Sequence, residues 1–371
     1  MYKELKKGIT TGTCAALASG AAVRALITGK FPEKASLMTP AGIAVSEKIM
    51  DAELCGGTAS CAVRKYSGDD PDITDGMMVY SRVRLTDAPG IKIDGGKGVG
   101  RVTKPGLSQS VGEAAINRVP RMMIEEAVRN ELEKAGCDKG AEIVISVPGG
   151  EKAAEKTFNP RLGIEGGISI LGTSGIVEPM SEKALTDTIN AELRYKRANG
   201  EEYALIVPGN YGMDFIRENT GIDIDRAVKC SNFIGEALDM SIRHGYKGVL
   251  LIGHAGKLIK LAAGIMNTHS KNADARSEIM AANAAVCGAD RDTIVKIFEC
   301  VSVDEMAQAV KECGIYKKVM ERIARRIDFY MKNRCRGEIK YGVIMFSNVH
   351  GIMAKTPEAD ELLEVIGGRR A

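Results

Sequence analysis

Short, almost uninterrupted apolar runs dominate the chain after residue 140, and they constrain its fold more than any other feature. Each run has the length of a strand that is buried on both faces. Segments with a helical pattern separate most of the runs, and three further helices are expected within 291–334. This alternation predicts a mostly parallel sheet with helices on both faces. The apolar runs are AEIVISV, GISIL, YALIV, GVLLI and YGVIMF, and the helical segments are 181–197, 232–244, 256–266 and 272–287.

The first part of the chain has a different pattern. A small-residue helix is expected over 14–29, and a second helix begins at Pro120. Between them, three β-prone runs within 43–85 are separated by turn residues, which is typical of an antiparallel sheet. We therefore predict an α+β domain over 1–138. It is followed by an α/β domain over 139–371, with a mostly parallel sheet flanked by helices and a C-terminal helical segment.

The composition of the 371 residues limits the classes of function. A net charge of only +3 argues against a dedicated nucleic-acid binder, which usually carries a basic face. No apolar run reaches the roughly 18 residues of a membrane span, and no signal peptide is evident. Nine scattered cysteines without a C-x-x-C pair are typical of free thiols in a reducing cytoplasm. We therefore expect a cytoplasmic globular protein that binds neither nucleic acid nor a membrane.

Turns rich in glycine and small hydroxyl residues recur along the chain and suggest an enzyme built around a large ligand. The run GITTGTC leads into a helix, whose N-terminus attracts carboxylates or phosphates, with plain helix capping as the alternative. In 166–180, an apolar run ends in the turn GTSG, where backbone amides can approach a ligand closely. The residues concerned are Thr11, Gly12, Thr13, Gly172, Thr173, Ser174 and Gly175.

Charged loops form a second group of candidates. The loop over 68–76 carries four aspartates, of which Asp69 or Asp70 could act as a general base, and the group could hold Mg²⁺. A solvated turn explains the same residues equally well. The basic glycine loop over 95–106 lacks the complete phosphate-loop pattern but suits an acidic ligand, with a flexible hairpin crossing as the alternative. The proline turn over 158–163 offers directional donors for a carboxylate, with a structural turn as the alternative.

Three strand ends in the second domain carry glycine turns that we expect to line one edge of the sheet. GVLLI is followed by His254, Lys257 and Lys260, in a segment that resembles a shortened phosphate loop. Its glycines are three apart rather than five, and leucine replaces the Mg²⁺-binding hydroxyl, which excludes a true phosphate loop. Open α/β sheets nevertheless bind ligands at such strand–loop–helix junctions. The other two turns are 148–151 and 208–212, and the three together fit a nucleotide-like cofactor.

Taken in order, the motifs resemble the cobalt-precorrin-5B C1-methyltransferase family of anaerobic cobalamin biosynthesis. The resemblance extends from near the N-terminus to about residue 276. It implies transfer of a methyl group from S-adenosylmethionine to ring carbon C-1 of a cobalt-containing corrinoid precursor, by a fold unrelated to the other methyltransferases of that pathway. The matching segments are GITTGTCAA, KYSGDDPDITDG, GGKGVGRVTKPGL, AINRVPRMMI, 147–184, PGNYG, KCSNFIG and 253–276.

The resemblance also implies two sets of contacts. S-adenosylmethionine is expected on the strand ends of the second domain, with an acidic residue near its sulfonium. The tetrapyrrole substrate carries several carboxylates, so its pocket needs Arg, Lys and helix N-termini. The candidate catalytic residues are Asp69, Asp70 and His254. The expected cofactor contacts are Gly149, Gly150, Gly172, Thr173, Ser174, Gly175, Glu178, Gly209 and Asn210. The expected substrate contacts are Thr11, Gly12, Thr13, Lys104, Arg118, Arg121, Asn159, Arg161, Lys257, Lys260 and His269.

Two rival functions stay open at this point. A nucleotide-dependent phosphotransferase or ligase would bind ATP and Mg²⁺. A non-catalytic corrinoid carrier would bind the tetrapyrrole but not S-adenosylmethionine. In the methyltransferase interpretation the cobalt belongs to the substrate, so no protein-bound metal is required. The sequence leaves open a homo-oligomer and a hand-over of the intermediate from neighbouring pathway enzymes.

Overall fold

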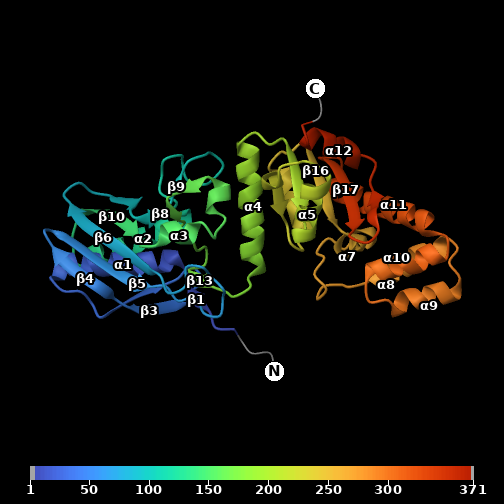
Figure 1. The fold of residues 1–371 in the computed structure, drawn as a ribbon. Helices are drawn as coiled ribbons and strands as arrows, with labels where there is room; N and C mark the ends of the chain where they lie inside the picture. The colour runs from blue at the N-terminus through green and yellow to red at the C-terminus, as the bar shows by residue number, and fades with distance from the viewer. Residues whose placement is uncertain (1–4, 369–371) are drawn as a thin grey trace. The chain divides into compact units, whose positions relative to one another are not determined.

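The computed structural model describes residues 5–368, and the chain divides into two compact units (Figure 1). The first unit ends at Glu182 and the second begins at Lys183. Helices and sheets occur in both units, which confirms the mixed α/β composition that the sequence predicts. Within residues 5–368, no helix is both long and apolar enough to cross a membrane.

A five-stranded sheet forms the centre of the first unit, in the order β4-β5-β6-β10-β7. Neighbouring strands are antiparallel, except that β10 and β7 run parallel. The alanine-rich α1 and the amphipathic α2 share one apolar core with this sheet. The bounds are α1 Thr11–Thr28, β4 Met50–Cys55, β5 Thr58–Arg64, β6 Met78–Thr86, β7 Ile91–Gly95, α2 Arg118–Lys134 and β10 Gly140–Ser146.

Short strand pairs hold the loops of the first unit. β1 and β13 are antiparallel, as are β9 and β11 and the hairpin of β2 and β3, whereas β8 and β12 are parallel. These pairs bring the glycine-rich segments of the sequence against one another. The bounds are β1 Gly8–Ile9, β2 Lys34–Met38, β3 Ala44–Lys48, β8 Gly98–Val99, β9 Arg101–Val102, α3 Gly150–Ala154, η1 Asn159–Leu162, β11 Ile164–Glu165, β12 Gly167–Ile168 and β13 Ile176–Val177.

The apolar run AEIVISV, expected to open the second domain, forms β10 of the first unit. It is an interior strand that pairs with β6 on one side and β7 on the other. The compact units therefore divide between Glu182 and Lys183, within α4 (Glu182–Ala198), rather than near residue 138. GISIL contributes only the two-residue strand β12. Length and apolarity predict that such runs are buried, but they do not specify which sheet a strand joins.

The second unit contains a second five-stranded sheet, in the order β15-β14-β16-β17-β18. The first four strands are parallel and β18 is antiparallel at the edge. Along β14, Leu205 and Val207 pack with α5 and α12 on one face, while Ala204 and Ile206 pack with α4, α6 and α11 on the other. The bounds are β14 Tyr203–Val207, α5 Asn210–Asn219, β15 Ala227–Lys229, α6 Ile234–Arg243, β16 Gly248–His254, α11 Tyr316–Cys335, β17 Lys340–Ser347, β18 Gly351–Lys355 and α12 Ala359–Ile366.

The helices of the second unit mostly lie where the sequence predicts them. The segment 256–266 differs, because a single α-helical turn continues as a 3₁₀ helix. The helix α5 is not predicted from the sequence, because its first residues, NYG, have the composition of a turn. The remaining bounds are η2 Ile224–Arg226, α7 Ala255–Leu258, η3 Ile259–Ala263, α8 Arg276–Val286, α9 Arg291–Glu299 and α10 Val303–Glu312.

Candidate functional site

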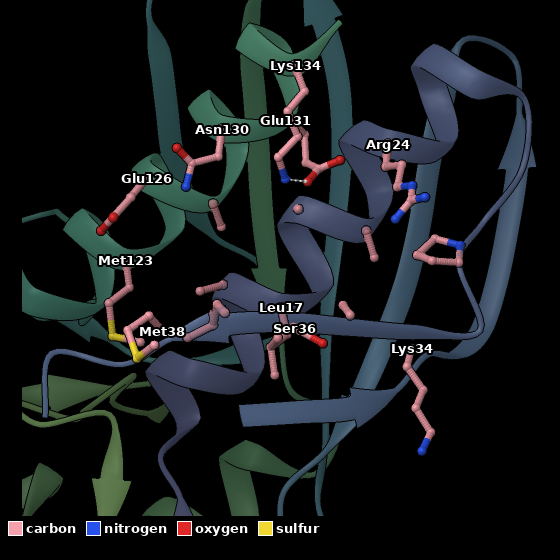
Figure 2. Close-up of a pocket in the computed structure, with 17 residues that line it drawn as sticks. Leu17, Arg24, Lys34, Ser36, Met38, Met123, Glu126, Asn130, Glu131 and Lys134 are labelled. Atoms are coloured by element: carbon pink, nitrogen blue, oxygen red, sulfur yellow. Dashed lines mark hydrogen bonds and ion pairs between the residues drawn. The ribbon is translucent and has the colours of Figure 1, made fainter. Parts of the chain in front are cut away.

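A cavity of about 360 Å³ lies between α1, α2 and β2 of the first unit (Figure 2). Small residues such as Gly20 and Ala127 line it, together with charged side chains. Two of those charges, Lys134 and Glu131, pair with each other at 2.6 Å. None of the candidate catalytic, cofactor-binding or substrate-binding residues lines this cavity.

The threonines at the start of α1 hold the turn GTSG in place. Thr11 Oγ1 accepts a hydrogen bond from the amide of Leu171 at 2.8 Å, and Thr13 Oγ1 donates to the carbonyl of Gly175 at 2.6 Å. The amide of Gly12 donates to the carbonyl of Leu171 at 2.9 Å. Protein groups therefore close this helix N-terminus. The three residues expected to contact substrate are buried and have structural partners.

Two glycines of the same turn are required by its shape. Gly172 and Gly175 have positive φ angles of 134° and 79°. A Cβ on Gly172 would overlap the side chain of Thr10, and one on Gly175 would lie 2.8 Å from Cβ of Thr39. Both glycines are thus explained by packing and backbone conformation. Thr173, between them, is exposed and is the side chain of this turn that is best placed for a ligand.

The carboxylates of Asp69 and Asp70 tie their loop to neighbouring segments. Asp69 Oδ2 accepts from the amide of Lys6 at 2.8 Å, and Asp70 Oδ1 accepts from the amide of Met180 at 3.1 Å. A carboxylate has further acceptor capacity beyond one such bond, so both remain candidate bases. Within residues 5–368, no three His, Cys, Asp or Glu side chains gather in a group that could hold a metal ion.

A buried ion pair anchors the same loop. The Lys65 side chain is only 2% exposed, and its Nζ lies 2.6 Å from Asp72 Oδ2 and 2.5 Å from Ser67 Oγ. Burial raises the pKa of Asp72, but the hydrogen bond and charge of Lys65 outweigh it, and the pKa lies below its usual value. Glu178, expected near the sulfonium, forms an exposed ion pair at 2.7 Å with the Lys7 ammonium, whose hydrogen bond lowers the Glu178 pKa.

Three glycines from separate motifs pack backbone against backbone. A Cβ on Gly98 would overlap the carbonyl oxygen of Val147, and a Cβ on either Gly150 or Gly167 would overlap the carbonyl group of Gly98. Gly150 is therefore a packing residue, although it was expected to contact the cofactor. Gly149 differs, because it is exposed and its nearest neighbour beyond the adjoining residues, Met77 Cε, would lie 3.8 Å from an added Cβ.

The expected substrate contacts of the first unit fall into two groups. Asn159 is buried, and it donates to the carbonyl of Gly167 at 3.0 Å while accepting from Ser169 Oγ at 3.1 Å. The guanidinium of Arg121 donates to three backbone carbonyls, those of Ile116, Ile93 and Ala114. These two side chains therefore support the local fold. The exposed or half-buried cations that remain are Lys104, Arg118 and Arg161.

The parallel sheet of the second unit has a topological switch point between β14 and β16. From β14 the chain proceeds through α5 to β15 on one side, and it then crosses through α6 to β16 on the other side. In open α/β sheets, ligands bind outside the carboxyl ends of the strands at such a point. Gly209 and Asn210 follow β14 there, and His254 ends β16. The structure thus brings these three predicted residues to one edge of one sheet. The third turn expected there, 148–151, instead follows β10 in the sheet of the first unit.

Lys257 connects the strand ends at this edge. Its Nζ donates to the carbonyl of Pro208 at 3.2 Å and approaches the carbonyl of Ser231 at 3.5 Å. Burial lowers the pKa of Lys257, and none of the charged groups that act on this pKa is a carboxylate. Ser231 has a φ of 52°, a left-handed conformation that is uncommon outside glycine. A half-buried cation and a strained residue thus meet at the end of β15.

Four further side chains lie at this edge. Lys229 Nζ donates to Asn210 Oδ1 at 2.9 Å, which leaves the Asn210 amide hydrogens for another partner. His254 Nδ1 accepts from the amide of Gly256 at 3.2 Å, so the proton of the neutral ring lies on Nε2. The Tyr211 ring, 61% exposed, lies 5.2 Å from the His254 ring. Lys229 and Tyr211 are not among the candidate residues drawn from the sequence, although they lie within the matching motifs KCSNFIG and PGNYG.

Lys260 and His269 do not join this set. Lys260 is 3% exposed, and its Nζ donates to the carbonyls of Thr268 and Ala273 at 3.2 and 2.8 Å. His269 is exposed, and its Nδ1 accepts from the amide of Lys271 at 3.1 Å. Both side chains stabilise the loop that follows η3. We define the strand-end cluster as Asn210, Tyr211, Lys229, His254 and Lys257.

Comparison with known proteins found two matching family models. One, described as CbiD, matches residues 1–179, and the other, described as the CbiD C-terminal domain, matches residues 267–357. A curated relative from Ruminiclostridium cellulolyticum, named cobalt-precorrin-5B C(1)-methyltransferase, is 48% identical and the match covers 94% of this chain and 90% of the relative. A relative of the same name from Alkaliphilus metalliredigens is 43% identical, and the match covers 98% of this chain and 96% of the relative. A crystal structure described as a cobalamin biosynthesis protein from Archaeoglobus fulgidus is 31% identical in sequence. The match covers 74% of this chain and 84% of that chain, with a TM-score of 0.38.

Proposed function

The chain belongs to the CbiD family, and from this we infer that it is an enzyme that methylates ring carbon C-1 of cobalt-precorrin-5B in cobalamin biosynthesis. The observation that carries this conclusion is similarity along nearly the whole chain. Relatives named for this activity are 43% and 48% identical over 98% and 94% of the chain. The expectation raised by the ordered motifs is confirmed at this level.

We propose that S-adenosylmethionine is the methyl donor and that it binds at the strand ends of the second unit. Gly209 and Asn210 lie at the switch point of the sheet, where a nucleotide-like ligand is expected. The exposed Tyr211 ring beside His254 offers an aromatic face to the adenine. For the carboxylates of the tetrapyrrole, we propose Lys104, Arg118 and Arg161 of the first unit, because their charged groups are not buried.

The chemistry places modest demands on the protein. A bond forms between ring carbon C-1 and the methyl carbon while the carbon–sulfur bond breaks, and the electron pair of the broken bond remains on sulfur. Holding the two reactants in line is the main contribution, since orientation alone can supply several kcal/mol. Where a proton must also be accepted, Asp69 and Asp70 are better candidates than His254. The Nδ1 of His254 is already an acceptor within the protein, and its Nε2 presents a hydrogen.

The first experiment separates the methyltransferase from a phosphotransferase or a carrier. S-adenosylmethionine and S-adenosylhomocysteine are titrated into the protein by calorimetry, with ATP and Mg²⁺ as the control. Methyl-labelled donor is then incubated with the protein and cobalt-precorrin-5B. We expect saturable binding of both sulfur ligands, no binding of ATP and label in the macrocycle. Binding of ATP alone would contradict the proposal in favour of phosphotransfer, and macrocycle binding without transfer would favour a carrier.

Single substitutions of Asp69 and Asp70, compared with a control in the same loop, test whether these aspartates are catalytic. We expect Asp69→Asn or Asp70→Asn to lower kcat about 100-fold or more if that residue accepts a proton, with little change in donor affinity. Asp75→Asn is the matched control in the same loop, because Asp75 Oδ1 accepts from the amide of Ser67 and has no proposed catalytic role. Equal, small losses in all three variants would assign the loop a structural role only.

A further inference from the structure

The strand-end cluster presents hydrogen-bond donors and no carboxylate. Two of its members are ammonium groups, Lys229 and Lys257, and neither forms an ion pair with a described carboxylate. The amide nitrogen of Asn210 and the Nε2–H of His254 are donors as well, since the opposite atoms of these groups are occupied within the protein. Lys257 is half-buried whereas Lys229 is exposed. A half-buried cation without a counter-ion is costly, and an anionic ligand removes that cost for Lys257.

The geometry concentrates these donors at one point of the sheet. Lys229 is the last residue of β15 and is paired with Val207, the last residue of β14. His254 is the last residue of β16, the strand on the other side of β14. Lys257 reaches from α7 to the carbonyl that follows β14. The donors therefore come from three adjacent strand ends, and the switch point lies in their midst.

Other lysines of the chain show that this arrangement is selective. Lys260, only three residues from Lys257, has Asp274 at 3.7 Å, and Lys65 has Asp72 at 2.6 Å. Buried or half-buried lysines of this chain thus commonly lie close to a carboxylate. Among the described residues, the hydrogen-bond acceptors of Lys257 Nζ are the neutral carbonyls of Pro208 and Ser231. A carbonyl orients an ammonium but leaves its net charge uncompensated.

We propose that the strand-end cluster is a carboxylate-binding site in which Lys257 and Lys229 hold the anion and His254 and Asn210 donate hydrogen bonds to it. The assignment of the carboxylate rests on the proposed function. That function supplies two sources: the amino-acid carboxylate of the methyl donor, and the acidic side chains of the tetrapyrrole. Lys257 is a binding residue in either case.

Two ligand pairs distinguish the sources. S-adenosylhomocysteine is compared with methylthioadenosine, which lacks the amino-acid carboxylate. Dicyanocobyrinic acid, whose side chains are free acids, is compared with dicyanocobinamide, in which they are amides. Each is titrated by calorimetry into the full chain and into the variants Lys257→Met and Lys229→Met. Lys311→Met, an exposed lysine of α10, is the charge-matched control.

We expect Lys257→Met to weaken the binding of one of the two acids, S-adenosylhomocysteine or dicyanocobyrinic acid, by about tenfold or more. A loss of this size corresponds to one hydrogen bond to a charged group. Its carboxylate-free counterpart and the Lys311→Met control should bind as before. Weaker binding of S-adenosylhomocysteine assigns the site to the methyl donor, and weaker binding of dicyanocobyrinic acid assigns it to the macrocycle. Circular dichroism checks the fold, and if Lys257→Met does not fold, Lys229→Met and Lys257→Gln carry the test.

The proposal is overturned if both acids bind the folded variants as tightly as the wild type, or if neither acid binds the wild type. Methyl transfer by the same preparation separates this result from the function itself. Transfer that continues with unchanged affinities leaves the methyltransferase standing and removes the carboxylate site. Loss of acid binding in Lys257→Met, in a protein that never transfers methyl groups, supports the site and contradicts the function.

Discussion

The ammonium of Lys257 lies 3.2 Å from the carbonyl oxygen of Pro208, so a side chain from the helix after β16 reaches the end of β14. The contact crosses the switch point of the parallel sheet. It holds a positive charge at the place where the topology favours a ligand. Two neutral carbonyls fix the orientation of this charge, and no described carboxylate cancels it.

Affinity for the carboxylate ligand should therefore decline as pH rises. The decline should occur at a lower pH than it would if the pKa of Lys257 had the usual value of a lysine. Burial lowers the pKa of Lys257 below its usual 10.5, the Cys230 thiol acts in the opposite direction, and the nearby Lys260 lowers it further. Only the protonated form attracts an anion, so affinity falls as pH rises through the lowered pKa. Calorimetry between about pH 7 and 10 measures this decline. The same decline in Lys257→Met would contradict the assignment.

Breaking the buried ion pair of the first unit should destabilise it strongly. Lys65 is 2% exposed on its side chain, and Asp72→Asn would leave its ammonium without a charged partner. We expect a loss of roughly 3 kcal/mol in the free energy of unfolding, measured by urea denaturation at neutral pH. Glu142→Gln, which breaks an exposed pair with Arg84, is the control and should cost less than about 1 kcal/mol.

The pH dependence of the same pair has a definite sign. The pKa of Asp72 is lowered in the folded protein, so its contribution to stability is present above the unfolded pKa. That contribution is lost as pH falls through the folded value. Stability of the wild type should thus decline in acid more steeply than that of Asp72→Asn. Parallel stability curves for the two proteins would contradict this, because they would mean that folding does not lower the pKa of Asp72.

Gly98→Ala should be among the most damaging single substitutions in the chain. Its Cβ would overlap the carbonyl oxygen of Val147, and its φ of 76° is unfavourable for alanine. We expect a loss of at least about 3 kcal/mol. Gly29→Ala separates the two causes, because Gly29 has a φ of 75° with no heavy atom near an added Cβ. It should cost only about 1–2 kcal/mol, and equal losses would mean that the overlap relaxes freely.

The hydroxyl of Thr13 should matter for the turn that it holds. Thr13→Val removes the 2.6 Å bond to the carbonyl of Gly175 at a site that is fully buried. We expect a loss of about 1–3 kcal/mol, with Thr13→Ser close to the wild type. Hydrogen exchange of the amides of Thr10 and Ala41, which donate to the carbonyls of Gly175 and Ser174, should accelerate in the valine variant alone. Slow exchange in all three proteins would show that other contacts hold the turn.

The sequence predicts the second unit better than the first. Runs such as YALIV and GVLLI become interior parallel strands, because a strand covered on both faces needs apolar residues throughout. AEIVISV is also a mostly apolar run but joins the sheet of the first unit. Pairing partners are decided by contacts that are distant in sequence, and a single run carries no record of them.

The candidate site divides in a similar way. Strand ends and helix starts are local features, and they correctly bring Asn210, His254 and Lys257 to one edge. Glycines and threonines were less informative, because close backbone packing and ligand binding both require small residues. Gly150 packs on Gly98, and Thr13 bonds to Gly175. Only the three-dimensional neighbours distinguish the two uses.

The position of β10 has a consequence for how the chain is made. β10 is the last of its five strands in chain order, yet it lies between β6 and β7. During synthesis, β7 has no partner in the sheet until Ser146 has left the ribosome. A nascent chain of intermediate length therefore carries two open strand edges, which are prone to incorrect pairing. The first unit can close only after most of its residues have been translated, so chaperones that shield strand edges should act on it at that stage.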